Sequence, residues 1–390
     1  MSDTPGSTTT TTTTTRRIAG AMSGTSADGV DVAITRIDGR GYDMRPQLVH
    51  HHHRPYPRDL RQNIFAIRSS GAASLSSLGE LARQVSLVNA AAVNEALVAS
   101  KIAATDLAAV AAHGQTLFHD PPNTIQWLDA SLLAAEVGAP VVSDFRRADC
   151  AAGGQGAPLV PFADYILFRH AQKTRVLLNI GGIANVTILP AGAPLDRVIA
   201  FDTGPGNCIS DYLCRRFDAA GSGYDPDGLF ALSGFADRHL VERVLTHPFF
   251  SRRPPKSTDG PGMVSAFMEV AEPGLPEEVR ERDLTNLLAA ACCVTTTSIV
   301  DAVRALGVVP DEFIASGGGI KNQALMEQLR KLAGDCPIEV SDARGVPSQA
   351  KEALAFALLG AATLDGIPAN IPSVTGARRP VVLGCITPRP

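Results

Sequence analysis

A carboxylate at the end of a short apolar run is the residue of this sequence best suited to chemistry. Asp202 follows the run 198–201, which is typical of a buried strand, and precedes the segment TGPGN at 203–207. Glycines let a ligand approach the backbone, and helical spacing of apolar residues begins at Asn207. Open α/β sheets carry reacting groups at such strand ends. The segment therefore indicates either a catalytic carboxylate or an Asp that only caps the turn.

A polar turn separates two predicted strands near the beginning of the sequence. Residues 17–22 and 30–37 have strand character, and the turn between them reads SGTSADG. Asp-Gly is a common hairpin signal, but this turn has more polar groups than a tight hairpin requires. Its backbone N–H groups could cradle phosphate oxygens, and Asp28 could hold a hydrated Mg²⁺. A Walker loop is excluded because the pattern GxxxxGK[ST] is absent.

A second strand–glycine–strand pattern lies in the other half of the chain. Gly181 and Gly182 alone separate predicted strands at 175–180 and 183–189. Two such hairpins predict two related lobes that close on a nucleotide. The glycine triplet 317–319 follows another predicted strand and leaves room for a flat group such as an adenosine, although a triplet alone does not specify a ligand.

Three further polar segments each follow closely on a short apolar run. They are HGQT at 113–116, DFRRAD at 144–149 and GGQGAPL at 153–159. Amide, carboxylate and guanidinium groups suit a ligand rich in hydroxyl groups, such as a sugar. The alternative for His113 and Arg146 is a hydrogen bond that is satisfied inside the fold.

The composition restricts the class of protein. A chain of 390 residues predicts two lobes, and 45% apolar with 19% charged residues describes a soluble globular protein. The net charge of −4, without a block of Lys or Arg, argues against binding to nucleic acid or to an anionic membrane. No apolar run predicts a membrane span, and no secretion signal is apparent. The seven scattered cysteines indicate reduced thiols in a cytoplasmic protein.

The remaining segments are interpreted from periodicity and composition. Residues 1–15, which end in a threonine run, predict a disordered tail. The four histidines at 50–53 are interpreted as a solvated strand end. Long helices are predicted at 74–100 and 283–306, and another begins near Ser348 and carries Glu352. The segment 261–276 is predicted to be irregular, and 372–388 to be loop and edge strand.

Taken in order, the motifs resemble those of the anhydro-N-acetylmuramic acid kinases. The resemblance extends from residue 17 to the C-terminus and rests on long, specific segments: MSGTSADGVD (22–31), HGQT (113–116), DFRR (144–147), GGQGAPL (153–159), NIGGIAN (179–185), FDTGPGN (201–207), PPKST (254–258), GGG (317–319) and SVTGA (373–377).

The resemblance implies a fold and a setting. The fold is the two-lobed α/β actin/hexokinase/Hsp70-like ATPase fold, in which each lobe has a ribonuclease-H-like mixed sheet flanked by helices and the nucleotide lies in the interlobe cleft. Lobe I would comprise 16–145 and 352–390, and lobe II 146–351. The resemblance also implies a cytoplasmic homodimer of cell-wall recycling that uses ATP and Mg²⁺, with an anhydro sugar as its other small-molecule partner.

The resemblance also implies roles for individual residues. Water attacks C1 of the anhydro sugar while O6 leaves toward the γ-phosphate of ATP. Asp202 matches the general base, and Glu352 matches a glutamate near the attacking water. No metal is bound by the protein directly, because Mg²⁺ is carried by ATP near Asp28. The substrate residues are His113, Asp144, Arg146 and Gly204. The nucleotide residues are Gly24, Thr25, Ser26, Ala27, Asp28, Gly29, Val30, Asp31, Gly181, Gly182, Gly317, Gly318 and Gly319.

The sequence departs from the family pattern at three places, and two alternative functions remain open beside the one that the resemblance implies. Relatives usually show Gln-x-Gly-Asp-Pro where this chain has QWLDA at 126–130, and Gly-Arg-Glu where it has DGP at 259–261. The threonine tail has no counterpart in the family. One alternative is a levoglucosan kinase, which acts on 1,6-anhydroglucose by the same mechanism. The other is a non-catalytic or chaperone-like nucleotide-binding module of the same fold.

Overall fold

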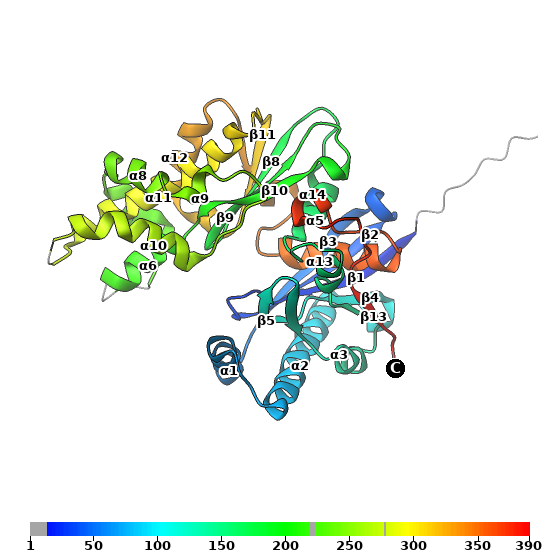
Figure 1. The fold of residues 1–390 in the computed structure, drawn as a ribbon. Coiled ribbons are helices and arrows are strands. Elements are labelled where there is room, and N and C mark those ends of the chain that lie inside the picture. Colours follow the sequence, from blue (N-terminus) through cyan, green and yellow to red (C-terminus); the bar gives the residue numbers. More distant parts are fainter. Residues whose placement is uncertain (1–13, 218–220, 222, 277) are drawn as a thin grey trace, which may run out of the picture. The chain divides into compact units, whose positions relative to one another are not determined.

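The chain forms two compact units, which are described separately (Figure 1). A computed structural model describes residues 14–217, 221, 223–276 and 278–390. Unit 1 contains the chain up to Ala151, together with Glu352–Ala369 and Val381–Pro390. Unit 2 contains Ala152–Lys351 and Asn370–Pro380.

Unit 1 is built on a six-stranded mixed sheet in the order β13-β7-β4-β1-β2-β3. β1 pairs antiparallel with β2 and parallel with β4. β2 pairs antiparallel with β3, β4 pairs parallel with β7, and β13 pairs antiparallel with β7. The strands are β1 (Thr15–Met22), β2 (Gly29–Asp38), β3 (Arg45–Pro55), β4 (Leu107–Ala112), β7 (Val141–Ser143) and β13 (Cys385–Thr387), and a separate hairpin is formed by β5 (Gln115–Asp120) and β6 (Asn123–Trp127).

Helices cover both faces of this sheet. Alternate residues of a strand face opposite sides, so Ala19 and Ala21 join the core cluster that α2 contributes to. Gly20 faces α13, where a Cβ atom would clash with the Ala353 carbonyl oxygen. The helices are α1 (Arg58–Ser70), α2 (Leu75–Ser100), α3 (Ala130–Val137), α4 (Arg147–Ala151) and α13 (Lys351–Leu364), with 3₁₀ turns η1 (Gly41–Asp43) and η2 (Ala104–Asp106).

Unit 2 repeats the same pairing pattern in a five-stranded sheet. Its order is β10-β9-β8-β11-β12. β8 pairs antiparallel with β9 and parallel with β11, as β1 pairs with β2 and β4 in unit 1. β9 pairs antiparallel with β10, and β11 pairs parallel with β12. The strands are β8 (Arg175–Ile180), β9 (Ile183–Leu189), β10 (Ile199–Pro205), β11 (Glu312–Ser316) and β12 (Ile338–Val340).

The central helix of unit 2 is α11 (Glu281–Ala305). Contrary to the prediction that no apolar run could span a membrane, this helix is long and apolar enough to do so. However, 72% of its most apolar window is buried. It is therefore a core helix. The other helices are α5 (Val160–Phe168), α6 (Cys208–Phe217), α7 (Leu229–Ser233), α8 (Arg238–Leu245), α9 (Pro248–Ser251), α10 (Gly260–Ala271), α12 (Gln323–Ala333) and α14 (Pro372–Thr375), with η3 (Leu195–Arg197), η4 (Pro226–Gly228), η5 (Glu272–Gly274), η6 (Gly318–Lys321) and η7 (Ser341–Arg344).

Both predicted hairpins and the long helices are confirmed, but three local predictions are wrong in part, one of them because residues Pro372–Thr375 of the predicted loop form the short helix α14. Much of the segment 261–276 is helical, because Asp259 caps α10 by accepting the Gly262 N–H at 2.7 Å and Phe267 is fully buried. Thr15 is part of β1 and donates a hydrogen bond to Asp38 Oδ1 at 2.6 Å, so it does not belong to a disordered tail. The prediction for residues 1–13 lies outside the described residues.

The unit boundaries differ from the predicted lobes in two places. Residues 146–151 cluster with unit 1 rather than with the second lobe. Residues 370–380 cluster with unit 2, because Ser373 Oγ donates to the Val198 carbonyl at 2.9 Å and Gln155 N–H donates to the Thr375 carbonyl at 2.8 Å. The C-terminal segment therefore contributes to both units.

Candidate active site

The polar turn between β1 and β2 is closed by its own hydrogen bonds. The Ala27 N–H donates to the Gly24 carbonyl at 3.2 Å, and Ser26 Oγ donates to Asp28 Oδ1 at 2.9 Å. Thr25, Ser26 and Asp28 are exposed, whereas Ala27 is fully buried with a positive φ of 47°. The exposed part of the turn thus offers hydroxyl groups, one carboxylate and backbone N–H groups to a ligand.

The other predicted nucleotide residues of this hairpin have structural roles in unit 1. Val30 is fully buried, and a Cβ atom at Gly29 would clash with the Arg54 carbonyl of β3. Asp31 Oδ1 lies 2.9 Å from His51 Nε2 and 3.2 Å from His53 Nδ1. The described residues contain no group of three or more His, Cys, Asp or Glu side chains placed to hold a metal ion.

Two predicted substrate residues of unit 1, His113 and Arg146, are hydrogen-bonded to each other. Arg146 Nε donates to His113 Nε2 at 3.0 Å, so His113 carries its proton on Nδ1, which lies 2.9 Å from the Gly114 carbonyl. Burial, reinforced by the Arg146 charge, lowers the pKa of His113 to about 3. His113 is therefore neutral at physiological pH. The Phe356 ring of α13 packs against it with centroids 4.9 Å apart.

Glu352 and Asp144 complete the charged groups near this pair. Burial lowers the pKa of Arg146 to about 10, and the negative charge of Glu352 opposes that shift. Glu352 is exposed in the first turn of α13. Asp144 follows β7 with a positive φ of 61°, and burial raises its pKa against the opposing charge of Arg147. Unit 1 thus presents a neutral imidazole, a guanidinium and two carboxylates.

In unit 2, the segment after Pro255 is hydrogen-bonded to β10 around Asp202. The Thr258 N–H donates to Asp202 Oδ2 at 3.0 Å, and the Asp202 N–H donates to the Lys256 carbonyl at 3.1 Å. Asp202 lies beside a β-bulge, since the β9–β10 register shifts between Asp202 and Gly204. Burial raises the pKa of the Asp202 carboxyl, while the Thr258 N–H and the Lys256 charge oppose the shift. A carboxylate with a raised pKa accepts a proton more readily than an exposed one.

Neither Lys256 nor Thr258 was predicted to have a role of its own. The Lys256 ammonium donates to the carbonyls of Phe249 and Phe250, both at 3.3 Å, and lies 4.5 Å from the centre of the Phe249 ring. Burial lowers its pKa, and the charge of Asp202 opposes the shift. The only sequence signal was the PPKST segment, which carried part of the family resemblance.

The glycines beside Asp202 are explained by close packing inside unit 2. A Cβ atom at Gly204 would lie 2.8 Å from both Phe250 Cε1 and Ser298 Oγ. Gly206 faces the Gly181 carbonyl, where a Cβ atom would clash. These contacts account for both glycines without a ligand, so a substrate role for Gly204 remains a prediction.

The glycine hairpin of unit 2 is fixed to the beginning of α6. The Gly181 carbonyl accepts the Asn207 N–H at 2.8 Å, and the Gly182 carbonyl accepts the N–H groups of Gly206 at 2.9 Å and Cys208 at 3.1 Å. The hairpin and the turn after Asp202 therefore form one rigid element.

The glycine triplet packs against the end of β8. A Cβ atom at Gly317 would lie 2.6 Å from the Ile180 carbonyl oxygen, and one at Gly319 would clash with the Ile180 side chain. Gly318 is exposed and meets nothing within 4 Å. Within the triplet, Gly318 alone has an open side that a nucleotide could contact.

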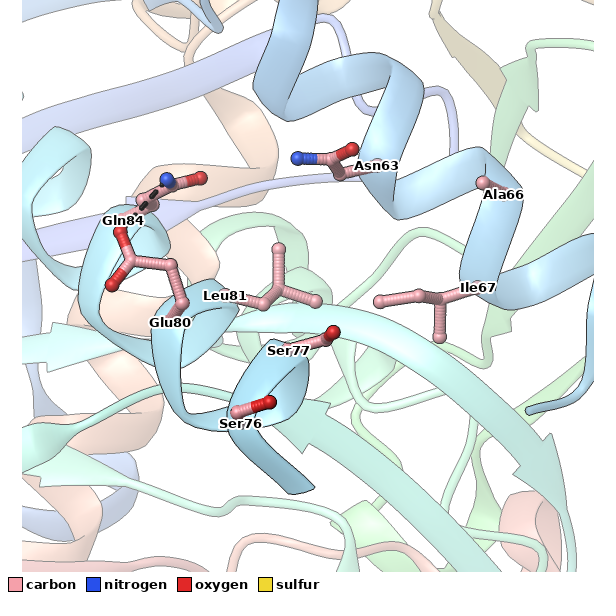
Figure 2. Close-up of a pocket in the computed structure, with 8 residues that line it drawn as sticks. All are labelled: Asn63, Ala66, Ile67, Ser76, Ser77, Glu80, Leu81 and Gln84. Carbon is pink, nitrogen blue, oxygen red and sulfur yellow. Dashed lines mark hydrogen bonds between the residues drawn. The ribbon is translucent and has the colours of Figure 1, made fainter. Parts of the chain in front are cut away.

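A hollow of about 440 Å³ lies between α1 and α2 (Figure 2). Ile67 and Leu81 point toward each other across it, and Glu80 accepts a hydrogen bond from Gln84 at 2.9 Å. It is lined by Asn63, Ala66, Ile67, Ser76, Ser77, Glu80, Leu81 and Gln84. None of these residues was predicted to bind substrate or nucleotide.

The segments that depart from the family pattern have structural roles here. Asp129 caps α3 by accepting the Leu132 N–H at 3.0 Å, and Trp127 Nε1 donates to the Leu78 carbonyl at 2.7 Å. Asp259 caps α10.

All seven cysteines are free thiols, and Cys150, Cys214 and Cys292 are buried.

The two units share one mixed-sheet pairing pattern, and each has a glycine-containing turn between antiparallel strands, as expected for the actin/hexokinase/Hsp70-like ATPase fold. The profile of the anhydro-N-acetylmuramic acid kinase family matches residues 16–389. The chain therefore belongs to that family.

Several relatives carry the family name. An anhydro-N-acetylmuramic acid kinase of Bacillus cereus (strain B4264) is 39% identical over 383 residues, which cover 95% of this chain and 96% of that protein. One of Bacillus anthracis (strain A0248) is 38% identical over 383 residues, covering 95% and 98%. Among solved structures, a ROK family glucokinase from Streptomyces griseus in complex with glucose and AMPPNP is 14% identical, with coverage of 89% and 98% and a TM-score of 0.38.

Proposed function

We propose that this protein is an ATP-dependent kinase of 1,6-anhydro-N-acetylmuramic acid. It opens the 1,6-anhydro bond with water and phosphorylates O6, and the products are N-acetylmuramate 6-phosphate and ADP. The observation that carries the proposal is the half-buried Asp202 carboxylate, which the Thr258 N–H holds at 3.0 Å and whose pKa is raised by burial. The identity of 39% to a named kinase of this sugar supports the choice of substrate.

Asp202 acts as the general base in this proposal. It removes one proton from a water molecule while the water oxygen bonds to C1 of the sugar. The C1–O6 bond breaks, and O6 takes the γ-phosphoryl group of ATP, so that ADP leaves. The Thr258 N–H fixes one carboxylate oxygen, which leaves the other to accept the proton. A positioned base of this kind contributes about 10²–10⁴-fold to the rate.

The turn at 23–28 fits the phosphates of ATP. Its exposed residues provide backbone N–H groups, the hydroxyls of Thr25 and Ser26, and the hard oxygen ligands of Asp28 that Mg²⁺ prefers. Bound Mg²⁺ would neutralise phosphate charge during transfer. We also assign Gly181, Gly182 and the open side of Gly318 to nucleotide binding, because the family resemblance implies that these glycines contact ATP.

The unit 1 cluster has the chemistry of a sugar-binding group. His113 Nε2 is occupied by Arg146, so the pair presents the guanidinium N–H groups of Arg146 to hydroxyl oxygens. Asp144 accepts hydrogen bonds from sugar hydroxyls, and Glu352 orients the attacking water.

Because the reaction consumes ATP, we place the protein in the cytoplasm, as a homodimer like that implied by the family resemblance.

Product analysis tests the proposal. The protein is incubated with ATP, Mg²⁺ and 1,6-anhydro-N-acetylmuramic acid in ¹⁸O-water, and the products are identified by mass spectrometry. A 6-phosphosugar with the heavy oxygen at C1 is the expected result. Conversion of 1,6-anhydroglucose alone would show a levoglucosan kinase. ADP formed without any sugar would indicate a nucleotide-binding module with ATPase activity and would overturn the proposal.

A further inference from the structure

We propose that Gln115 is a positioning residue that holds the phosphate-binding turn in its binding conformation. This inference rests on the proposed function, because it assumes that the turn at 23–28 binds the phosphates of ATP. Gln115 is fully buried at the beginning of β5. Its Oε1 accepts the Ser23 hydroxyl at 2.7 Å, and its Nε2 donates to the carbonyls of Gly24 at 3.2 Å and Thr116 at 3.3 Å.

The hydrogen bond to Gly24 fixes the direction of a peptide group. In a trans peptide the carbonyl and the following N–H point in opposite directions. The Gly24 carbonyl is held by Gln115 Nε2 and by the Ala27 N–H at 3.2 Å, so the Thr25 N–H points away from Gln115. Thr25 is exposed, and in the proposed role its N–H is one of the groups that bind a phosphate oxygen.

Arg68 of α1 likewise fixes the direction of the next peptide group, between Thr25 and Ser26. Its Nη1 donates to the Thr25 carbonyl, which directs the Ser26 N–H to the opposite side. Two successive N–H groups with fixed carbonyls resemble the backbone concavities that bind anions. Arg68 is only half-buried, whereas the Gln115 amide is buried and has three partners, so we assign the constraint to Gln115.

Gln115 also connects the turn to the sugar-binding cluster within unit 1. It follows His113 by two residues, and the His113 N–H donates to the Ala21 carbonyl of β1 at 2.9 Å. One buried side chain therefore joins the strand end that carries His113 to the beginning of the phosphate turn. If Gln115 served stability alone, its substitution would lower the thermal unfolding midpoint without weakening nucleotide binding in the protein that remains folded.

The test compares Gln115→Glu with Gln126→Glu. In the first variant the carboxylate can still accept the Ser23 hydroxyl, but its other oxygen faces the Gly24 and Thr116 carbonyls without a proton to donate. In the control, Gln126 Nε2 donates only to hydroxyl oxygens, Thr124 Oγ1 at 2.8 Å and Thr116 Oγ1 at 3.4 Å, and hydroxyls can rotate to donate instead. Both changes remove one buried or half-buried amide from the same hairpin, β5–β6.

The measurements are the Kd of Mg²⁺–AMPPNP by calorimetry without sugar, and the thermal unfolding midpoint. We expect Gln115→Glu to weaken nucleotide binding about 10- to 100-fold, because the Gly24 carbonyl loses one of its two donors and then faces a carboxylate oxygen, while Gln126→Glu stays within about twofold. Gln115→Leu, which cannot donate but adds no charge, is measured in parallel in case the carboxylate prevents folding.

Unchanged nucleotide affinity in a folded Gln115 variant would overturn the inference. So would a loss of affinity that appears only with loss of the cooperative unfolding transition, since that would show a structural role. If the wild-type protein binds no nucleotide, the inference and the proposed function both fail. If it binds nucleotide but phosphorylates no anhydro sugar, the proposed function fails while the positioning role of Gln115 is still decided by its variants.

Discussion

Replacing Asp202 by Asn should abolish most activity while leaving the fold intact. Asn retains an oxygen that can accept the Thr258 N–H, now 3.0 Å from Oδ2, and the backbone bond to the Lys256 carbonyl at 3.1 Å is independent of the side chain. The amide cannot take a proton from water. A general base contributes about 10²–10⁴-fold, which corresponds to about 3–5 kcal/mol of activation free energy.

The stability of the variant follows from the sign of the pKa shift. Burial raises the pKa of Asp202 in the folded state, so the folded protein takes up its proton at a higher pH than the unfolded chain. The carboxylate therefore disfavours folding above its folded pKa, and this effect disappears below its unfolded pKa. Asn removes the charge, and the free energy of unfolding at pH 7 should be unchanged or slightly higher.

The assay is sugar-dependent ADP release with saturating ATP, followed across pH. For the wild type, kcat/KM should fall on the acid side at a pH above the ordinary pKa of an aspartic acid, because the base must be deprotonated. Asp211→Asn is the matched control, since burial also raises the pKa of Asp211 in α6. Turnover of the Asp202 variant within tenfold of wild type, with normal stability, would refute the role of Asp202 as base.

Three further changes test other parts of the structure. Lys351→Met should lower the free energy of unfolding by about 3–5 kcal/mol, because it removes the ammonium that lies 3.0 Å from Asp164 Oδ1 and leaves a buried carboxylate without a cation. The double variant with Asp164→Asn should recover part of this loss, as measured by urea titration. Between pH 7.5 and pH 5 the wild type should lose about 2 kcal/mol of unfolding free energy through His113, because its folded pKa of about 3 lies below the unfolded value and protons bind only to the unfolded chain in that range. His113→Gln should not show this part of the loss. Equal losses in both proteins would contradict the prediction. Gly206→Ala should destabilise unit 2 by about 1–3 kcal/mol through its clash with the Gly181 carbonyl, and a thermal midpoint equal to wild type would show that the hairpin can move aside.

Local patterns predicted the elements well where one rule determined the structure. Alternation over 30–37 and the SGTSADG turn predicted the β1–β2 hairpin, and two glycines between apolar runs predicted β8–β9. The helix α10 was missed because Gly260, Pro261 and Gly262 suggested a loop, although they occupy the first turn after a capping aspartate. Proline and glycine are tolerated there because the first turn needs no intrahelical N–H partner.

Contacts between distant segments could not be predicted from such patterns. Gln115 and Ser23 are 92 residues apart, and Thr258 and Asp202 are 56 apart. No periodicity relates them. The glycines are also ambiguous in sequence, because Gly317 is required by the Ile180 carbonyl whereas Gly318 faces open space. A glycine motif indicates a close approach, but it does not say whether a ligand or the protein itself approaches.

The division of unit 1 between both ends of the chain has a consequence for its synthesis. β1 and β4 are translated first, but α13, which packs on Gly20 of β1 and through Gly360 on Ala111 of β4, follows only after unit 2. At ordinary rates of about 5–20 residues per second, the roughly 200 intervening residues take about 10–40 seconds to translate. During that interval an apolar sheet face of the nascent chain lacks its covering helix. Unit 2, whose strands all lie between 175 and 340, can complete its sheet before then, so we expect it to fold on the ribosome before unit 1 does.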